Sequence, residues 1–536
     1  MRARYHGEVT TRQERVMFRA AAVAAERRTT VGFMFGDLAD DPANRLPEGK
    51  TTVDAMVMLG QAMAVDSSSA ESGIPAAYTY FGQFIDHDIT KTLFDESLQP
   101  PGGPDVIEDE ALKPLPREKV IELVSNARTA SLDLDSVYDG LALEALQPGG
   151  TFRLGVVSPS EFGPIQTADR FHDLPRRDLI PDPQNEEDQE RDRQALIGDP
   201  RNDENLLVAQ LHVAILRSHN KLVTERGLTS EEARTAIRRR YQWSILHDFL
   251  PRVCDPGVVK DILANGPSVW TAASKADLFI PVEFSGAAYR FGHSMIRGEY
   301  SHNATFSPPP GRVRATFNFF FTFTALSGDL TLEDGPSKKS PTLPDNWTIE
   351  WHRFFGTDTL PASLNPARRI DANLTPELGN LRNFQGLPIQ DLMGRLATRN
   401  LLRGYLLGLP TGQAVANRLG LPPLPEDTLR KATPSGLKEK IEEAGLLTRT
   451  PLWFYILAEA GDPEGPDGQH LGPVGSRIVT ETLWNLAKHA KDSVIEDPPS
   501  QAELDSGEYT LKGLIKIGQD AALPPLEVTS PIKAAR

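Results

Sequence analysis

A histidine between two aspartates is the clearest chemical feature of the sequence. His87 is flanked by Asp86 and Asp88 in a segment, residues 76–90, whose aromatic and aliphatic side chains recur at helical spacing. Gln83 precedes His87 by four residues, so the two side chains share one helix face. An imidazole can take up and return protons as a general base and acid. A salt-bridged helix end at the surface explains these residues alone equally well, although their apolar neighbours favour a buried helix.

The sequence around this histidine resembles that of a known family. GQFIDHDIT, residues 82–90, is similar to the distal-histidine signature of the animal-type haem peroxidases, the peroxidase–cyclooxygenase superfamily, including its bacterial members. Family members also carry a distal arginine three residues before a glutamate, just ahead of a long helix. Arg201 and Glu204 have this spacing and precede the helical pattern of residues 205–225.

Two further segments resemble the proximal side of the family's haem site. AAYRFGHSMI, residues 287–296, supplies Arg290 and His293, and RNLLRGYLLGLP supplies Asn400 and Arg403. The resemblance implies that His293 ligates the haem iron and that Asn400 accepts a hydrogen bond from the other ring N–H of that histidine. It also implies that Arg290 pairs with a haem propionate and that Arg403 belongs to the same cofactor-binding group.

The resemblance implies roles on the distal side as well. His87 would be the base for hydrogen peroxide, and Arg201 the fixed cation that stabilises the charge developing on oxygen. Gln83 matches a residue that helps to bind halide. Asp86 and Glu204 match positions at which family members form ester bonds to haem methyl groups. The expected cofactor is haem b, with these two ester links as a further expectation.

One position departs from the most strongly oxidising members of the family. The best-known leukocyte enzyme has a methionine after the glutamate, which adds a sulfonium link to the haem, and this chain has Asn205 there. The departure disfavours the oxidation of chloride. Bromide, iodide and thiocyanate stay open as substrates beside small organic donors.

The segment TASLDLDSVY, residues 129–138, resembles the family's calcium loop. Calcium prefers several oxygen ligands from carboxylates, hydroxyls and carbonyls. The expected ligands supply such oxygens and are Thr129, the carbonyl of Ser131, Asp133, Asp135 and, next to the distal histidine, Asp88. Asp135 stands where the family usually has serine, which predicts a more anionic site. Taken alone, the segment is better explained as a turn with two solvated aspartates.

Two other functions stay open. A fatty-acid dioxygenase or epoxygenase of the same superfamily would carry a tyrosine three residues before the proximal histidine, where this chain has Arg290; Tyr289 lies four residues before it. Direct hydrogen abstraction from lipid is therefore disfavoured. The aromatic run at residues 317–323 is expected in the core or along an apolar substrate channel. A non-enzymatic haem- or calcium-binding scaffold should have lost His87 or Arg201, and both are present.

Helical patterns dominate the elements that must position these residues. Apolar spacing predicts helices over residues 55–64, 75–90 with Pro75 at the first helical position, 205–225, 230–249, 282–296, 392–407, 437–443 and 479–491, and alternation predicts one strand over residues 151–157. The matching segments must converge on one haem, which predicts a single large domain. The fold implied by the resemblance is mainly α with very little β, with haem between the His87 and His293 helices. We expect an N-terminal arm at 1–30, a haem peroxidase domain at 31–495, and a C-terminal extension at 496–536 that packs on the domain or is partly flexible.

The composition excludes several classes of protein. The chain has 536 residues and a net charge of −16, so it lacks the basic excess that holds nucleic acid. It contains no apolar stretch of the roughly 18 residues needed to span a bilayer. Its N-terminus lacks the apolar region of a Sec signal peptide, so we expect a cytoplasmic protein or export by a non-classical route. The single cysteine, Cys254, excludes an intrachain disulfide and is expected to be a buried small residue.

Overall fold

The computed structural model describes residues 29–64, 70–94, 112–159, 172–178, 180, 184–307, 313–325, 343–356, 365–379, 381 and 395–519. Helices dominate these residues and strands form only small sheets, which confirms the prediction of a mainly α fold with very little β. The α-helices in chain order are α2 (Gly36–Asp40), α3 (Lys50–Ala62), α4 (Ala77–Ile89), α5 (Arg117–Leu123), α6 (Asp135–Tyr138), α7 (Glu186–Arg191), α8 (Leu206–Thr224), α9 (Ser230–Ser244), α10 (Leu250–Val253), α11 (Pro256–Asn265), α12 (Val282–Gly286), α13 (His352–Phe355), α15 (Leu396–Leu406), α16 (Gly412–Arg418), α17 (Glu426–Ala432), α18 (Lys438–Glu443), α19 (Leu452–Ala460), α20 (Pro473–Lys488), α21 (Gln501–Asp505) and α22 (Leu511–Ile517).

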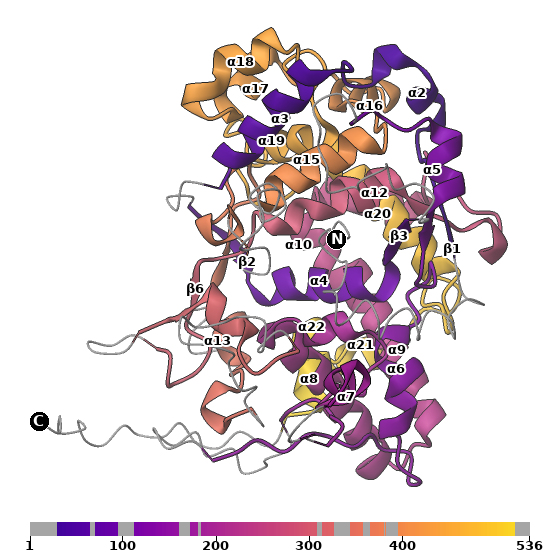
Figure 1. Ribbon diagram of the computed structural model, residues 1–536. Coiled ribbons are helices and arrows are strands. Elements are labelled where there is room, and N and C mark those ends of the chain that lie inside the picture. The colour runs from indigo at the N-terminus through magenta and orange to yellow at the C-terminus, as the bar shows by residue number, and fades with distance from the viewer. Residues whose placement is uncertain are drawn as a thin grey trace, which may run out of the picture.

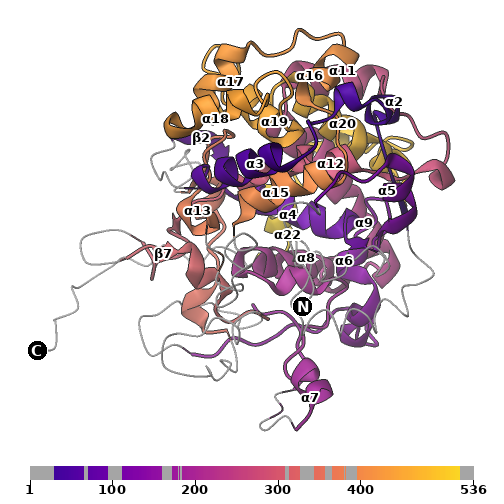
Figure 2. The ribbon, with the colours of Figure 1, turned by 45° about the horizontal axis from the view of Figure 1, so that its top comes forward.

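The histidine helix α4 runs through the middle of the molecule. Figures 1 and 2 both show it between an upper group of helices that includes α3, α12, α15 and α19 and a lower group that includes α8 and α22. α4 contacts α8 and also the short 3₁₀ helix η8 (Ala288–His293). Its apolar residues Phe81, Phe84 and Ile85 are fully buried. The segments around the predicted distal and proximal histidines therefore pack against each other.

The sheets are short and serve to place loops. In the largest, β1 (Thr29–Gly32) pairs antiparallel with β4 (Val124–Asn126) and parallel with β5 (Ile280–Pro281), and β3 (Thr92–Phe94) adds antiparallel to β4. β3 directly follows α4, so this pairing brings the chain after β4 back to the C-terminal end of α4. The two-stranded sheets are β2 (Glu71–Pro75) with β8 (Pro366–Arg368) and β6 (Glu299–Tyr300) with β7 (Ala315–Thr316).

Two long helices form where the periodicity predicts them, and their first turns explain why. The Asn205 side chain accepts a hydrogen bond from the Val208 amide and caps α8. Thr229 and Glu232 form a reciprocal capping box at the start of α9. α9 continues into a π-helical turn, η6 (Ile245–Phe249), in which Asp248 accepts hydrogen bonds from the Tyr78 hydroxyl.

Three predictions about elements are wrong. Pro75 ends strand β2 instead of starting α4. The helix predicted over 282–296 breaks after Gly286, because Ala287 has a non-helical backbone (φ −137°, ψ −73°), and the chain continues as η8. Residues 151–157 form isolated bridges instead of a strand, such as that between Gly155 and Asp173. Residues 392–394 of the predicted helix 392–407 lie outside the described residues, and the rest forms α15.

The C-terminal part of the described chain packs on the lower helices. α22 contacts α8 and α9, and the Arg217 guanidinium donates to the carbonyl of Gly518 at 2.9 Å. The proposed arm lies almost wholly outside the described residues, which begin with β1 at Thr29. The division into an arm, a domain and an extension stays a prediction.

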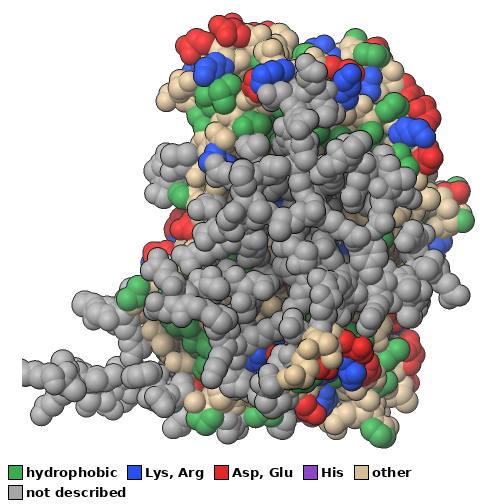
Figure 3. Space-filling model, viewed as in Figure 1, with side chains coloured by type: hydrophobic (Ala, Val, Ile, Leu, Met, Phe, Trp, Pro, Cys, Tyr) green, Lys and Arg blue, Asp and Glu red, His purple; other side chains and the backbone are tan. Residues whose placement is uncertain are grey.

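Acidic and basic side chains are interspersed on the described surface in Figure 3. An example is the ion pair between Arg430 of α17 and Glu442 of α18, whose atoms lie 2.6 Å apart. Among the described residues, no helix combines the length and the apolar character that crossing a membrane requires. Cys254 is buried, as predicted, and burial raises the pKa of its thiol to about 12.

The close crossing of α3 and α15 generates a prediction. A Cβ atom on Gly60 of α3 would lie 2.5 Å from the backbone nitrogen of Thr398 in α15. We expect Gly60→Ala to lower the free energy of unfolding by about 1–3 kcal/mol, because two backbones must separate. Gly436→Ala, where a Cβ meets no atom within 4 Å, is the matched control and should be close to neutral. Equal unfolding midpoints for the two variants would contradict the close-packing argument.

Candidate functional site

The last carbonyl groups of α4 are bound by side chains from elsewhere in the chain. The Arg201 guanidinium donates to the carbonyl oxygens of His87 at 3.0 Å and Thr90 at 2.6 Å. The Arg128 guanidinium donates to the carbonyl of Asp88 at 3.2 Å. A helix leaves its last carbonyls without partners of its own, and cations are favourable at this end. Two arginines therefore fix the helix end that carries the candidate base.

The His87 ring is fully buried and held by one hydrogen bond. Its Nδ1 lies 2.9 Å from Oδ1 of Asn202, and Nδ2 of the same amide lies 3.1 Å from Nδ1 of His212. Because the amide oxygen accepts, Nδ1 of His87 carries the ring proton. Nε2 then has a free lone pair, and it has no hydrogen-bond partner among the described residues. Burial, with the nearby charge of Arg201, lowers the pKa of His87 to about 4, so the ring is neutral at pH 7.

Arg201, the candidate distal cation, is buried beside this histidine. Its guanidinium contacts both carboxylate oxygens of Asp199, at 3.0 and 2.9 Å. Burial opposes the ionisation of Asp199, but Arg201 and Lys91 outweigh it and hold the pKa of Asp199 well below its ordinary value. The guanidinium charge is therefore fixed in place by a permanent counter-charge.

The two candidate ester residues lie in different surroundings. The Thr90 hydroxyl donates to the Asp86 carboxylate at 2.6 Å. Burial raises the pKa of Glu204 to about 8, although the charges of Arg201 and Arg399 pull it down. Glu204 is thus largely protonated at pH 7.

Gln83 is tied to the start of α8. Its Oε1 accepts a hydrogen bond from Nδ2 of Asn205 at 3.2 Å, and Asn205 also caps α8 through its own oxygen. This bond directs the amide nitrogen of Gln83 away from Asn205. Asn205 therefore has a structural task that methionine could not perform.

His293, the candidate iron ligand, lies in η8 next to Asn400 of α15. The Asn400 side-chain nitrogen is 2.8 Å from Nδ1 of His293, and its oxygen accepts from Arg290 at 3.4 Å. The resemblance predicts that the amide oxygen accepts from the histidine. Were iron bound at Nε2, the proton would lie on Nδ1, and the Asn400 amide, turned by 180°, would accept it. The contact between the two side chains is present, and the direction of this hydrogen bond stays a prediction.

Positive charge surrounds His293. Burial and then the charges of Arg290, Arg399 and Arg403 lower its pKa well below the ordinary value. Arg399 also acts on Glu204, on the distal side. Glu204 directly follows the 3₁₀ helix η5 (Pro200–Asp203), and the three arginines come from η8 and α15. These elements therefore share one electrostatic environment.

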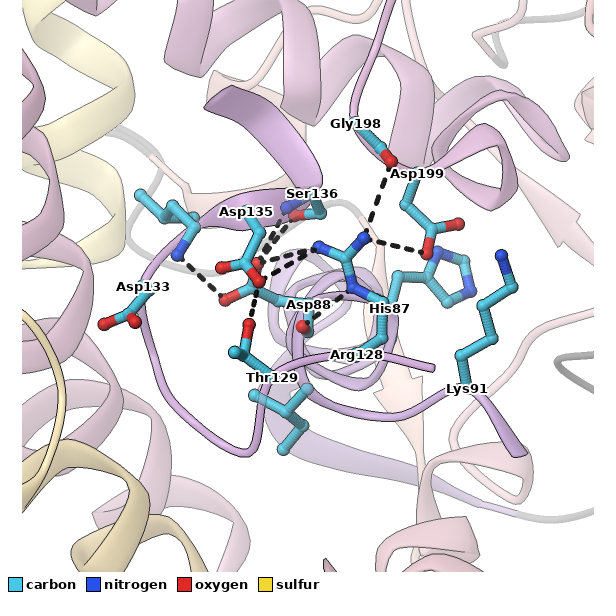
Figure 4. Close-up of polar contacts among 12 residues, drawn as sticks. His87, Asp88, Lys91, Arg128, Thr129, Asp133, Asp135, Ser136, Gly198 and Asp199 are labelled. Atoms are coloured by element: carbon cyan, nitrogen blue, oxygen red, sulfur yellow. Dashed lines mark hydrogen bonds and ion pairs between the residues drawn. The ribbon is translucent and has the colours of Figure 1, made fainter. Parts of the chain in front are cut away.

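The predicted calcium ligands do not all meet. Figure 4 shows Asp88 and Asp135 close together and Asp133 apart from them. Thr129 donates to the Asp135 carboxylate. The Asp133 carboxylate instead accepts from the backbone amide of Lys491 at 2.6 Å and lies 3.3 Å from a lysine ammonium group.

An arginine occupies the space between the carboxylates. The Arg128 Nη2 lies 4.0 Å from oxygens of both Asp88 and Asp135. The Asp88 carboxylate accepts from two backbone amides and two hydroxyls. The amides are those of Leu134 and Ser136, and the hydroxyls are those of Ser136 and Tyr241. In the described part of the chain no group of three acidic, histidine or cysteine side chains is arranged to hold a metal ion. The residues as placed do not fit calcium, and the predicted shell of five ligands is not formed.

Sequence reasoning missed Asn202, Asp199 and Arg128. Asn202 orients His87. It could have been found in the sequence as a polar residue directly after Arg201. Asp199 forms an ion pair with Arg201. It could have been found in the sequence because an acidic residue directly before Pro200 stands at a usual helix-capping position. Arg128 directly precedes the predicted calcium loop, and a cation beside a cation site was a signal against that site.

Known proteins resemble this chain in sequence and in fold. Residues 35–425 match the family model described as animal haem peroxidase. A peroxidase-like protein from Margaritifera margaritifera is 27% identical over 270 residues, and the match covers 41% of this chain and 31% of that protein. The chain therefore spans less than a third of the length of that relative.

Solved structures show the same fold. Peroxidase A from Dictyostelium discoideum is similar with a TM-score of 0.51 and 16% identity, over 85% of this chain and 89% of that one. A fatty acid α-dioxygenase from Oryza sativa, in a structure with palmitic acid, gives a TM-score of 0.50 and 14% identity, over 88% of this chain and 78% of that one. At these identities the likeness concerns the fold alone.

The buried histidine generates a prediction about pH. The pKa of His87 is lowered from 6.5 to about 4 in the folded protein, so the unfolded chain binds the proton more tightly. The contribution of this residue to stability is complete above pH 6.5 and is lost as the pH falls towards 4, by up to about 3 kcal/mol. We expect His87→Gln to lose less stability than the wild type between pH 7 and 4.5, measured by unfolding midpoints. His470→Gln, outside the site, is the control, and an unchanged pH profile in His87→Gln would contradict the prediction.

Proposed function

Because the chain belongs to the animal haem peroxidase family, we propose that it is a haem-dependent peroxidase that uses hydrogen peroxide to oxidise small organic donors. The observation that carries the proposal is the state of His87. Its Nε2 is buried, neutral and without a hydrogen-bond partner among the described residues, while Nδ1 is held by Asn202. A base with this geometry can take a proton from a small molecule placed next to Nε2.

The residues present fit a haem group. His293 would bind the iron through Nε2, supported by Asn400. The positive charges of Arg290 and Arg403 next to His293 suit the two propionates of a haem. When bound, haem would supply the iron that activates peroxide and accepts its oxidising equivalents.

The distal residues would handle the proton and the charge. His87 would accept a peroxide proton at Nε2 while its Nδ1–H stays hydrogen-bonded to Oδ1 of Asn202, so the ring would not rotate during the transfer. Arg201 would provide a fixed positive charge for the negative charge that develops on oxygen, and its pairing with Asp199 means that the guanidinium would not have to move. The role of Arg201 is thus electrostatic preorganisation.

We further propose a limited choice of substrates and links. Asn205 caps α8 and cannot form the sulfonium link of a methionine, which favours easily oxidised halides, bromide and iodide, over chloride. Asp86 and Glu204 are the residues that would form ester bonds to haem. Retention of haem through acidic organic extraction, lost in a variant with Asp86→Ala and Glu204→Ala, tests these links.

A fatty-acid dioxygenase is the second candidate, and Tyr289 is the observation that favours it. Burial, with the charge of Asp86 on α4, raises the pKa of Tyr289 well above its ordinary value, so the phenol lies within electrostatic reach of the distal helix. In that function, the buried phenol near α4 would be the source of a radical that takes hydrogen from a lipid.

The kinetic prediction separates the two histidines. His87→Ala should keep the haem absorption band and lose peroxide-dependent guaiacol oxidation by about two to four orders of magnitude, the usual contribution of a positioned acid–base group. His293→Ala should lose most of the haem band, because the iron loses its ligand. In the wild type, the rate of reaction with peroxide should fall as the pH drops through about 4, where the pKa of His87 lies. Full peroxide reactivity in His87→Ala would remove the assigned base.

A second measurement separates the two candidate functions. Linoleate is supplied with oxygen and a trace of peroxide, and oxygen uptake is followed beside guaiacol oxidation. We expect guaiacol turnover to be at least tenfold faster than oxygen uptake. Tyr289→Phe should give the same two rates as the wild type, because the phenol has no role in peroxide cleavage. Sustained oxygen uptake that disappears in Tyr289→Phe would establish the dioxygenase instead.

A further inference from the structure

We propose that Arg128 takes the place of a metal ion, as the internal cation that joins the distal-histidine helix α4 to α6 and to η5. The chain would therefore need no calcium to order its candidate site. This inference concerns how the site is held together and is independent of which reaction the site performs.

The contacts of Arg128 reach all three elements. Its Nε donates to the backbone carbonyl of Asp88 at the end of α4. Its Nη2 makes no hydrogen bond among the described residues and lies 4.0 Å from the carboxylates of Asp88 and Asp135, so this interaction is between charges. Its Nη1 donates to the carbonyl of Gly198 at 3.5 Å and lies 3.7 Å from the Asp199 carboxylate. Figure 4 shows the guanidinium group between these partners. A planar guanidinium with five donors can bind several partners at once, as a metal ion does.

The charges around Arg128 favour a cation at this place. Asp88, Asp135 and Asp199 are all buried, and Asp88 and Asp199 are fully so. Arg201 pairs with Asp199 at 2.9 Å. Two buried carboxylates close together are unfavourable unless a positive charge lies near both. Arg128 supplies that charge from within the chain.

The backbone explains how Arg128 arrives there. β3 and β4 pair with Thr92 opposite Asn126, which brings the chain after β4 alongside the end of α4. The Asn126 side-chain amide donates to the carbonyls of Ile89 and Arg128, at 2.8 and 3.1 Å. These two hydrogen bonds hold the chain after β4 next to the end of α4. The position of the guanidinium is therefore fixed by a sheet register and a side-chain clamp.

The same contacts make Arg128 a positioning residue for the candidate site. Asp88 directly follows His87, and Asp199 holds the guanidinium of Arg201. Gly198 lets the segment before η5 approach α6 closely, since a Cβ there would lie 2.1 Å from the carbonyl oxygen of Asp135. Loss of Arg128 would loosen both neighbours of the distal pair.

The first test is the calcium dependence of the full-length wild-type protein. We expect its unfolding midpoint to be the same in 1 mM CaCl₂ and in EDTA, and elemental analysis after purification without chelator to find no stoichiometric calcium. A midpoint that rises with CaCl₂ and falls with EDTA, or one calcium ion per chain, would overturn the proposal.

The second test asks whether Arg128 acts through charge or through packing. Arg128→Met keeps a similar apolar stem, and we expect it to lower the unfolding midpoint by roughly 5 °C, because buried carboxylates lose their cation. Asp135→Asn removes one of these carboxylates at nearly constant shape. In the double variant the loss should be clearly smaller than the sum of the two single losses, which is the mark of a direct electrostatic coupling.

The control is an arginine whose acidic partners reach solvent. Arg238 is similarly buried and contacts Asp492 at 2.7 Å and the exposed Glu231 at 3.0 Å. Arg238→Met combined with Asp135→Asn should give additive losses, since the two sites share no contact among those observed. Additive losses for Arg128→Met and Asp135→Asn as well would assign Arg128 a packing role only and overturn the proposal.

Discussion

The buried C-terminal end of α4 is the constraint on which the candidate site depends. The last carbonyls of this helix have no partners within the helix and are shielded from water, so other parts of the chain must supply donors. Arg201 and Arg128 supply them, and both guanidinium groups need counter-charges because they are buried. Asp199 lies against both, and it directly precedes η5. One requirement of backbone hydrogen bonding thus ties α4, the chain after β4 and η5 into a single unit.

The same unit sets the chemistry of the histidine. Asn202 follows Arg201 in η5, so the turn that caps α4 also delivers the amide that orients the His87 ring. Burial then keeps the ring neutral, and it keeps Glu204 largely protonated at pH 7. On the other side, burial and then arginine charges favour the neutral form of His293. Each histidine is held as an uncharged imidazole, the form that either a base or an iron ligand needs.

The sequence was sufficient for the parts of the structure that depend on local pattern. The spacing of Arg201 and Glu204 before a capped helix, and the apolar repeats of α4, α8 and α9, correspond to the observed elements. It was insufficient where a small backbone change or a tertiary contact decides. Helical periodicity does not distinguish an α-helix from the 3₁₀ turn that begins after Ala287. The position of Arg128 follows from the β3–β4 register, which cannot be read from the sequence of residues 129–138.

The turn that carries His293 also bears on the choice between the two candidate reactions. A 3₁₀ helix has three residues per turn, so Arg290 and His293 lie on one face and Tyr289 lies beside it. The Tyr289 ring stacks on Phe284 at 4.5 Å and meets Phe291 edge to face. Oxidising a phenol to a radical also requires a group that takes its proton, and the hydroxyl has no hydrogen-bond partner among the described residues. The surroundings that bury Tyr289 therefore disfavour the proton loss that a lipid-oxidising tyrosine needs, whereas the free Nε2 of His87 meets the corresponding requirement for peroxide.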